Sequence, residues 1–439
     1  MIALQARKIA EILGFNGEVP DCVIEEVSTD SRKVNDKTLF VALKGEKFDG
    51  HDFIRDVLDK GAPLVVAERP IDGVNPEHVI LVEDTLKAFG KLGQYNRRQF
   101  KGTLIALTGS SGKTTTKEEL KSVLSLFAPT YATSGNFNNF VGVPRSLLDL
   151  DMNAKFAVIE MGMSARGEIQ YLTSLAEPDV AVVTNVYPMH IEFLGTLENI
   201  ARAKAEIFSG LRKGGIAIYN EDTSYAELLR AEALRFADKV FSYGKQNHPQ
   251  VTLHLEDEAE HCFYNAWCVL KVAEVLGLDI QKASLAVNQF SAPEGRGKKH
   301  KLDIDGKHVV LIDDSYSGQP EAMKLAIRAL AQMKVGGKRV ALLGKMAELG
   351  DYSKQAHIEV GQELAKAHIN VVIGVCPETK DMLAQLPFDI QQFYFPNIDG
   401  VADFLKDEIL GEGDVLLIKG AHYSSQVFNV AQELLQYQK

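Results

Sequence analysis

The segment from Leu104 to Leu120 limits the fold of this 439-residue chain more than any other stretch. It reads LIALTGSSGKTTTKEEL, which is a short apolar run, a turn rich in glycine and serine, a lysine and then a helical pattern. Free N–H groups at the first turn of a helix bind anions, and glycines in the preceding turn let a phosphate approach the backbone. The order of strand, turn and helix therefore predicts a phosphate-binding loop within an α/β domain.

Two side chains give this loop its predicted chemistry. Lys113 is placed to neutralise the terminal phosphates of a nucleoside triphosphate, and the Thr114 hydroxyl is placed at a Mg²⁺ position. The strict motif opens on glycine whereas this loop opens on Thr108. A chance Gly-Lys-Thr sequence is therefore an alternative, against which the flanking strand and helix argue. The residues predicted to contact the nucleotide phosphates are Thr108, Gly109, Ser110, Ser111, Gly112, Lys113, Thr114 and Thr115.

Short apolar segments along the whole chain alternate with helical patterns, which favours parallel sheets covered on both faces. These segments lie at 38–43, 63–67 and 78–82, then at 104–107, 156–160, 180–184 and 216–219, and finally at 309–312, 339–343, 371–374 and 415–418. A stretch rich in glycine and lysine, 293–300, precedes the last group. Because single cores rarely grow beyond roughly 250–300 residues, we expect three α/β domains at residues 1–83, 84–296 and 297–439.

The composition argues against several classes of protein. A formal net charge of −11 disfavours nonspecific nucleic-acid binding, which needs a basic face. The four cysteines form no Cys-x-x-Cys pair, which disfavours a disulfide framework or a structural zinc site. No apolar run approaches the roughly 18 residues of a membrane span, and the first 15 residues read as an amphipathic helix and not a signal peptide. We expect a reduced, soluble, cytoplasmic protein.

Polar side chains follow two of the other predicted strands. Glu160 ends the strand FAVIE, and His190 follows the strand VAVVT in the stretch TNVYPMHIEFLGT. Ligands of open parallel sheets collect at the carboxyl ends of the strands, so Glu160 is placed to hold a metal and His190 to act as a ligand or polariser. A surface or turn role is the alternative for both. Lys204, in IARAKAEIF, reads from its own pattern as a solvated lysine on an amphipathic helix.

As a set, these motifs resemble those of the Mur ligases of bacterial cell-wall synthesis, and the resemblance runs nearly end to end. It is carried by STDSRKVNDKTLFVALKGEKFDGHDF (28–53), TGSSGKTT, GNFNNFVGVP (135–144), IEMG, TNVYPMHIEFLG, AKAEIF, DDSYSGQPEAM (313–323) and MAELG (346–350). The N-terminal block, DDSY and MAELG are similar to the member of the family that adds a dipeptide.

The resemblance implies both an architecture and a reaction. It implies a small N-terminal α/β domain that binds the UDP end of a substrate, a central P-loop parallel-sheet ATPase domain and a C-terminal Rossmann-like α/β domain. The implied reaction joins D-Ala-D-Ala to UDP-N-acetylmuramoyl-tripeptide through an acyl phosphate, with release of ADP and phosphate, in peptidoglycan precursor synthesis. ATP and Mg²⁺ are the implied cofactors, and the implied state is a monomer.

The resemblance also implies roles for individual residues. Lys113 would bind the β- and γ-phosphates, Thr114 and Glu160 would hold Mg²⁺, and His190 would bind a second Mg²⁺. Lys204 matches a lysine that relatives carboxylate to a carbamate, which would make it a metal ligand and catalytic group instead of a solvated lysine.

Asn265 would face adenine, and Arg296 and Asp314 would lie near the ribose and phosphates. The implied substrate contacts are Ser28, Thr29, Asp30, Ser31, Arg32, Lys44, Gly45, Asn136, Asn138, Asn139 and Tyr316. For 28–32, a polar turn before a strand is the alternative.

Several stretches depart from the family pattern. The usual Asn-Ala-Asn after Asp-Ser-Tyr is Ser317-Gly318-Gln319, and the usual Lys-Gly-Ser-Arg is Lys419-Gly420-Ala421-His422. Cys262 stands in place of an asparagine, Lys345 replaces an aspartate, and the segment 220–261 is short for the strands that relatives place there. These departures leave open a Mur-like ligase that joins a different amine or peptide to a carboxylate substrate. A nucleotide-binding regulatory protein without turnover is a further alternative, against which Lys113, Glu160, His190 and Lys204 argue.

Overall fold

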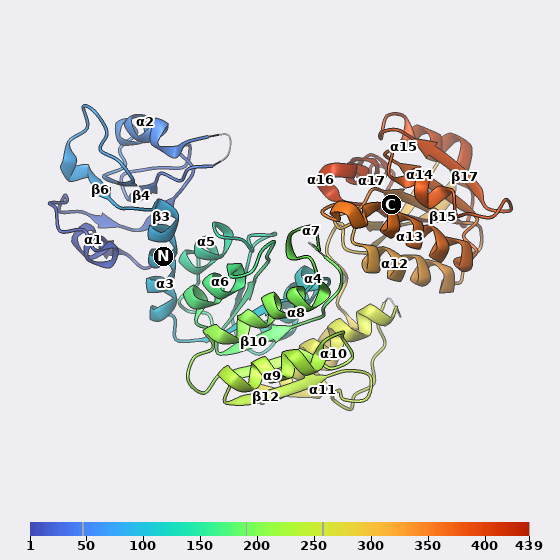
Figure 1. Ribbon diagram of the computed structural model, residues 1–439, viewed down its shortest axis with the longest axis horizontal. Coiled ribbons are helices and arrows are strands. Elements are labelled where there is room, and N and C mark those ends of the chain that lie inside the picture. Colours follow the sequence, from blue (N-terminus) through green and yellow to red (C-terminus); the bar gives the residue numbers. More distant parts are fainter. Residues whose placement is uncertain (46–47, 190, 257–258, 439) are drawn as a thin grey trace.

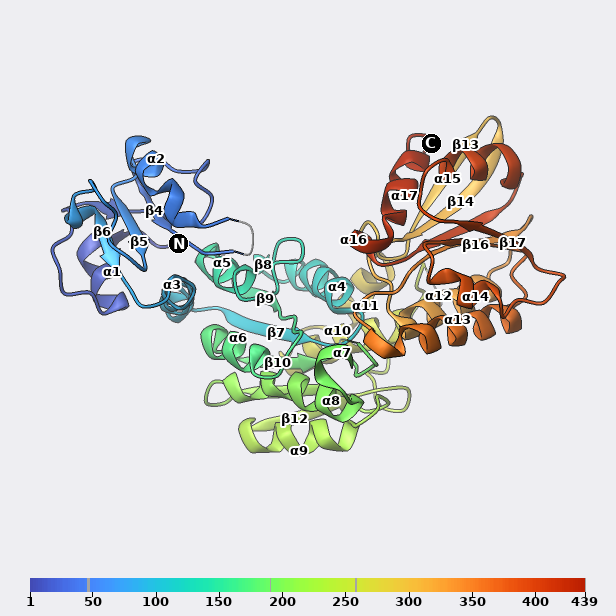
Figure 2. The same cartoon turned by 45° about the horizontal axis from the view of Figure 1, so that its top comes forward.

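The computed structural model describes residues 1–45, 48–189, 191–256 and 259–438. The chain forms three successive α/β units, and the middle unit lies between the other two (Figures 1 and 2). This confirms the expected three-domain α/β architecture. Among the described residues, no helix is long and apolar enough to cross a membrane.

The N-terminal unit is a four-stranded parallel sheet in the order β3-β4-β5-β6. Its strands are fully apolar at their centres, and both faces of the sheet carry a buried cluster. The elements are β1 (Leu4–Gln5), α1 (Ala6–Leu13), β2 (Val23–Ile24), β3 (Glu26–Ser28), β4 (Thr38–Val41), η1 (Gly50–Phe53), α2 (Ile54–Asp59), β5 (Leu64–Ala67), η2 (Pro76–His78) and β6 (Val79–Leu81).

Helix α3 (Thr85–Gln99) joins the first unit to the second. It begins at Asp84, whose side chain accepts a hydrogen bond from the Lys87 N–H and so caps the helix. Phe89 and Leu92 pack in the N-terminal core, whereas the buried Arg97 donates to the carbonyl of Ala176 in the middle unit. The helix therefore fastens two cores to one another.

The middle unit is built on a six-stranded parallel sheet in the order β12-β11-β10-β7-β9-β8. Successive residues of its strands alternate between two buried clusters, which explains why the strands are continuously apolar. Helices α5, α6, α8 and α9 cover one face, and α4, α10 and α11 cover the other. The elements are β7 (Thr103–Thr108), α4 (Lys113–Ser125), β8 (Thr130–Ala132), α5 (Gly142–Leu148), β9 (Phe156–Glu160), α6 (Glu168–Ala176), β10 (Val180–Val183), α7 (Ile191–Leu194), α8 (Leu197–Ala205), η3 (Glu206–Gly210), β11 (Ile216–Asn220), α9 (Ala226–Phe236), β12 (Lys239–Tyr243), α10 (Glu260–Val275) and α11 (Ile280–Asn288).

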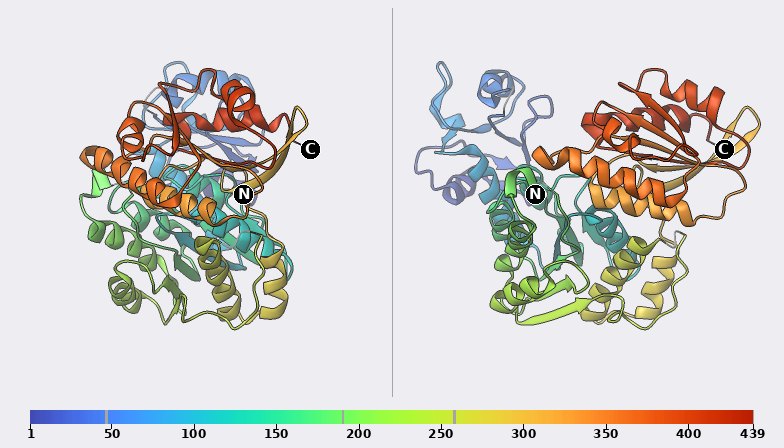
Figure 3. Two further views of the ribbon diagram at one scale, coloured as in Figure 1. Left: turned by 90° about the vertical axis from the view of Figure 1, so that its right-hand side faces the viewer. Right: turned by 45° about the vertical axis from the view of Figure 1, so that its right-hand side comes forward.

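The C-terminal unit has a six-stranded sheet in the order β13-β14-β18-β15-β16-β17, with clusters on both faces. Four of its strand pairs are parallel, and the edge pair β13–β14 is antiparallel. Helix α12 lies on the side that faces the middle unit and contacts α10 (Figure 3). The elements are β13 (Lys298–Ile304), β14 (Lys307–Asp314), α12 (Pro320–Gln332), β15 (Arg339–Gly344), η4 (Gly350–Tyr352), α13 (Ser353–Ala367), β16 (Val371–Val375), α14 (Thr379–Leu383), β17 (Gln391–Phe395), α15 (Val401–Phe404), η5 (Leu405–Ile409), β18 (Val415–Lys419), α16 (His422–Ser425) and α17 (Val427–Leu435).

Four described strands of the two larger sheets were not predicted from the sequence: β8, β12, β13 and β17. Strand β13 begins inside the stretch rich in glycine and lysine, since Lys298–His300 are its first three residues. The hairpin turn of β13 and β14 is Asp305-Gly306, both at positive φ. An Asp-Gly pair between two strands is a strong hairpin signal, and it was available in the sequence.

Candidate active site

The predicted phosphate loop connects the buried strand β7 to helix α4. Gly112 precedes the helix at φ +77°, a conformation that glycine adopts without strain. A Cβ atom at Gly112 would lie 2.8 Å from the Asn265 Oδ1, and one at Gly109 would overlap the Thr184 hydroxyl. Both glycines are therefore required by close approach of neighbouring chain segments, as the loop motif predicted.

The segment that follows β10 holds this loop in shape. The Ser111 N–H donates to the Asn185 Oδ1 at 2.8 Å, and the Thr184 hydroxyl donates to the Ser111 carbonyl at 3.0 Å. The Ser110 hydroxyl donates to the Tyr187 carbonyl at 3.0 Å and accepts from the Tyr187 N–H at 2.9 Å. The stretch TNVYP thus fixes the loop, a role that the sequence analysis did not assign to it.

Lys113 opens helix α4 with its ammonium turned back toward the loop. Its Nζ donates to the Gly109 carbonyl at 2.9 Å. Burial lowers the pKa of Lys113, an effect that the nearby Glu160 opposes and the nearby Arg296 reinforces. The loop cation, the carboxylate of β9 and a guanidinium from the start of the C-terminal unit therefore lie within electrostatic reach of one another.

Glu160 ends β9 and is 1% exposed. Its Oε1 accepts from the Asn138 side chain at 2.8 Å, and its N–H donates to the Thr133 hydroxyl at 3.2 Å. Its Oε2 has no hydrogen-bond partner among the described residues, although the Lys117 ammonium lies 3.9 Å away. A buried carboxylate oxygen with a free lone pair is a suitable ligand for a hard cation.

Lys204 is 2% exposed, so the structure overturns its interpretation as a solvated lysine. It lies near the C-terminal end of α8, and within the described parts of the chain no carboxylate pairs with its ammonium. Burial, together with repulsion from Lys113, lowers the pKa of Lys204 well below its usual value. His190, the remaining predicted metal contact, lies outside the described residues.

A pocket opens beside the loop, between the middle and C-terminal units. The predicted nucleotide contacts among its lining residues are Ser111, Gly112, Thr115, Asn265, Arg296 and Asp314. The other predicted loop residues, Gly109, Ser110, Lys113 and Thr114, are not among its lining residues, and Thr108 is fully buried. The structure thus brings the predicted adenine, ribose and phosphate contacts to one cavity.

The C-terminal unit contributes a second group of side chains to this region. The Arg296 guanidinium lies 4.0 Å from the centre of the Tyr316 ring, and Asp314 pairs with the buried Lys419 at 2.6 Å. The Tyr316 ring also stacks with the His422 ring, with ring centres 5.0 Å apart. His422, one of the departures from the family pattern, therefore contacts a predicted substrate residue.

The predicted substrate contacts of the middle unit lie on the loop after β8. Asn138 binds Glu160 as described above, and the Asn139 side chain accepts at 2.9 Å from the N–H of Gly142, the first residue of α5. Asn136 is exposed, and burial raises the pKa of Tyr316, an effect that the Asn136 side chain opposes. This loop therefore lies between the carboxylate of β9 and the C-terminal unit.

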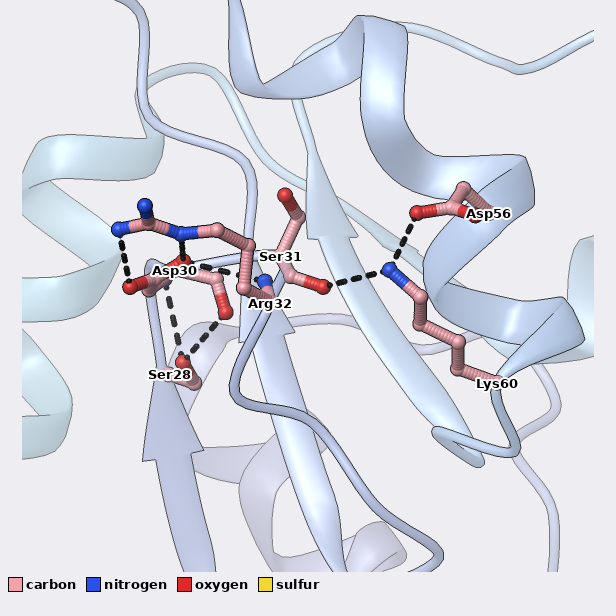
Figure 4. Close-up of polar contacts among 6 residues, drawn as sticks. All are labelled: Ser28, Asp30, Ser31, Arg32, Asp56 and Lys60. Carbon is pink, nitrogen blue, oxygen red and sulfur yellow. Dashed lines mark hydrogen bonds and ion pairs between the residues drawn. The ribbon is translucent and has the colours of Figure 1, made fainter.

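The predicted UDP-binding block follows β3 in the N-terminal unit, and none of its residues lines the nucleotide pocket. Asp30 and Arg32 form a two-pronged ion pair at 2.8 and 2.9 Å (Figure 4). The Ser28 hydroxyl closes the turn on the Asp30 backbone, and Lys60 donates to the Ser31 carbonyl at 3.2 Å. The Arg32 side chain is 84% exposed. These contacts fit a polar turn and leave the guanidinium accessible to a phosphate. Thr29 lies in the same turn, and Lys44 and Gly45 are exposed in a separate loop.

Lys117 is a buried residue of this site that the sequence analysis missed. Its side chain is fully buried, its Nζ donates to the Gly135 carbonyl at 2.8 Å, and it pairs with Glu118 at 3.0 Å. It therefore ties the loop after β8 to α4. A lysine in a helical pattern is normally predicted to be exposed to solvent. The one feature of the sequence that pointed to the site is the spacing of four residues between Lys113 and Lys117, which places both on the same face of the helix.

Replacing Lys117 with methionine is expected to lower the apparent free energy of unfolding by about 1–3 kcal/mol, because the Gly135 carbonyl loses its buried donor. Urea unfolding followed by circular dichroism measures this. Lys121→Met, an exposed change on the same helix, is the matched control, and equal midpoints for the two variants would contradict the assigned contact.

Comparison with known proteins connects this site to a family. Residues 23–93 match the Mur ligase family catalytic domain, 107–273 the Mur ligase middle domain and 300–422 the Mur ligase glutamate ligase domain. The UDP-N-acetylmuramoyl-tripeptide–D-alanyl-D-alanine ligase of Escherichia coli (strain K12) is 36% identical, in an alignment that covers 85% of this chain and 86% of that protein. The enzyme of the same name from Bacillus subtilis (strain 168) is 34% identical, in an alignment that covers 85% of each chain.

Solved structures give the same result for the fold. The crystal structure of MurF from Acinetobacter baumannii superposes with a TM-score of 0.88 at 29% identity, covering 99% of both chains. The structure of MurF ligase from Thermotoga maritima in complex with ADP superposes with a TM-score of 0.81 at 30% identity, covering 94% of this chain and 97% of that one. With matches in all three units and a phosphate loop set beside a buried carboxylate, the chain belongs to the Mur ligase family.

Proposed function

We propose that the chain is an ATP-dependent ligase that joins D-Ala-D-Ala to UDP-N-acetylmuramoyl-tripeptide in peptidoglycan precursor synthesis. The observation that carries the proposal is that Lys113 lies within electrostatic reach of Arg296, Glu160 and Lys204, next to a pocket lined by Arg296 and by Ser111 and Gly112 of the phosphate loop. The relatives that share 34–36% of their residues over 85% of this chain bear the name of that ligase.

The proposed reaction consists of two successive substitution steps, in which each bond formed is matched by a bond broken. A terminal carboxylate oxygen of the tripeptide attacks the γ-phosphorus of ATP, which forms an acyl phosphate and breaks the bond to ADP. The amine of D-Ala-D-Ala then attacks the acyl carbon and loses a proton, and phosphate leaves with the oxygen that came from the carboxylate. The products are one amide bond, ADP and phosphate.

The charge distribution of the site suits this reaction. A carboxylate that meets a triphosphate accumulates negative charge, and preorganised cations stabilise the transition state best where water is excluded. Lys113 comes from the first turn of α4 in the middle unit, whereas Arg296 lines the pocket at the junction with the C-terminal unit, so the two cations come from different parts of the chain. Approach of the two units around the reactants would keep water from the acyl phosphate.

The donor groups present fit Mg²⁺. The unpartnered Oε2 of Glu160 offers a hard oxygen ligand, and the Thr114 hydroxyl follows Lys113 in the first turn of α4. Lys204 would contribute an oxygen only as a carbamate, and its buried ammonium without a carboxylate partner suits such a conversion. His190 stays a predicted contact. When bound, Mg²⁺ supplies charge neutralisation for the phosphates.

Replacing Glu160 with glutamine is expected to raise the Mg²⁺ concentration for half-maximal ADP release by about tenfold, because a neutral amide is a weaker ligand than a carboxylate. A Mg²⁺ titration of ADP release at fixed substrate concentrations measures the change. Glu227→Gln, which alters a side chain that is 92% exposed on α9, is the control. An unchanged Mg²⁺ requirement in Glu160→Gln would contradict the metal role.

A panel of amines tests the proposed function. Purified protein, Mg·ATP and UDP-N-acetylmuramoyl-tripeptide are incubated with D-Ala-D-Ala or with other amino acids and dipeptides, and ADP release is followed. We expect release that requires D-Ala-D-Ala. Release only with another amine would show that Ala421, His422 and residues 317–319 have changed the acceptor pocket. The proposal includes a monomeric enzyme that acts in the cytoplasm, where ATP is available.

A further inference from the structure

Glu119 is a buried carboxyl group in the wall of the nucleotide pocket that the proposed reaction does not use. It lies on α4, is 3% exposed and lines the pocket together with Thr115, one turn earlier on the same face of the helix. Within the described residues, no hydrogen bond or ion pair reaches its side chain, and burial alone accounts for the raised pKa of the group. An unpaired buried carboxyl is costly, so a ligand that pairs with it gains affinity.

The position of Glu119 suits the base of a nucleotide. Gly112, at the phosphate end of the pocket, lies seven residues earlier, about 10 Å along the helix axis. An α-phosphate and a ribose span a distance of this order. The neighbouring pocket wall contains Leu255, Val287 and Phe290, which offer an apolar surface for a flat ring.

Asn265, the predicted adenine contact, already uses its amide oxygen in a hydrogen bond. The Asn265 Oδ1 accepts from the Thr116 hydroxyl at 3.2 Å and stands against Gly112. Asn265 is therefore tied to the phosphate end of α4. Glu119 is the acidic side chain of α4 that faces the cavity, since Glu118 pairs with Lys117 instead.

We propose that Glu119 is a specificity residue for the nucleotide, whose carboxyl oxygen accepts a hydrogen bond from the 6-amino group of adenine. This inference rests on the proposed function, in which ATP is the substrate, and adds the group that selects its base. Burial raises the pKa of Glu119 to about 8, so the group is mostly a neutral acid at pH 7 and its carbonyl oxygen remains an acceptor. A glutamine would keep that acceptor, whereas a methionine would remove it at similar volume.

A binding cycle tests the pairing by removing each partner separately and then both. The probes are ADP and purine riboside 5′-diphosphate, which lacks the 6-amino group, and the readout is the Kd from calorimetry. We expect wild type and Glu119→Gln to prefer ADP about five- to tenfold, the effect of one hydrogen bond. We expect Glu119→Met to lose this preference while it binds purine riboside diphosphate as wild type does.

Glu227→Met makes the same exchange on the exposed face of α9 and is expected to keep the full preference. An ADP preference retained in Glu119→Met, or lost equally in Glu119→Gln and Glu119→Met, would overturn the pairing. Because the cycle measures binding, its outcome is separate from ligation. D-Ala-D-Ala-dependent turnover without the pairing overturns only the role of Glu119, and the pairing without turnover overturns only the proposed function.

Discussion

Replacing Lys113 with alanine is expected to reduce ADP release by about a thousandfold or more while the fold stays intact. Lys113 is the cation at the first turn of α4, where the backbone N–H groups of the phosphate loop converge. Removing a cation from a phosphoryl-transfer site costs on the order of 10³-fold in rate. Because burial lowers the pKa of Lys113, the charged group is not a source of stability in the free protein.

The measurement for Lys113→Ala combines steady-state ADP release with far-ultraviolet circular dichroism and thermal unfolding. Lys121→Ala, an exposed change two turns further along the same helix, is expected to keep wild-type kinetics. Wild-type kinetics in Lys113→Ala with a preserved spectrum would show that the phosphate-loop assignment is wrong.

Replacing Lys204 with alanine is expected to lower turnover by about a hundredfold, with partial recovery on addition of formate or acetate. A carbamate on Lys204 would be a carboxylate surrogate, and deleting the side chain leaves a space in which a short carboxylate can supply the missing oxygen. Recovery by a short carboxylate is expected only for a buried lysine, because deleting a solvated lysine would leave no enclosed space. Lys204 is buried beside Lys113.

Two further variants separate the carbamate from the charge of Lys204. Lys204→Arg keeps a cation but forms no carbamate, so we expect it to stay as slow as Lys204→Ala. Arg202→Ala alters an exposed neighbour on α8 that pairs with Glu198, and it is expected to turn over normally. A wild-type rate in Lys204→Ala would exclude the proposed role.

Strands of the three sheets were predictable where both faces of a strand are buried. In β7 and β10, successive residues enter opposite clusters, so the sequence shows an uninterrupted apolar run. The strands that were missed lie at sheet edges or alternate in polarity. Strand β12 reads KVFSY with its first and third residues exposed, and β17 reads QQFYF. Edge strands lack the apolar signal because one side of each faces water.

Residues of the site were predictable from the sequence where their function depends on neighbours that are consecutive in the chain. The phosphate loop is such a case, because its strand, glycines and helix are consecutive. Glu160 was placed correctly at the end of a strand, but the surroundings of its two oxygens, Asn138 at Oε1 and Lys117 near Oε2, come from other segments of the chain. Lys117 and Glu119 were missed because each lies on a polar helix, and only the packing of α10, α11 and the loop after β8 buries them. Such burial is a tertiary property that helical periodicity alone does not reveal.

One isotope experiment tests the central claim, an acyl-phosphate ligase for D-Ala-D-Ala, most directly. The terminal carboxylate of UDP-N-acetylmuramoyl-tripeptide is labelled with ¹⁸O, and the products formed with Mg·ATP and D-Ala-D-Ala are analysed by mass spectrometry. The account predicts the D-Ala-D-Ala amide of the labelled tripeptide together with phosphate that carries one ¹⁸O atom. Phosphate without the label, or no amide with D-Ala-D-Ala, would contradict it.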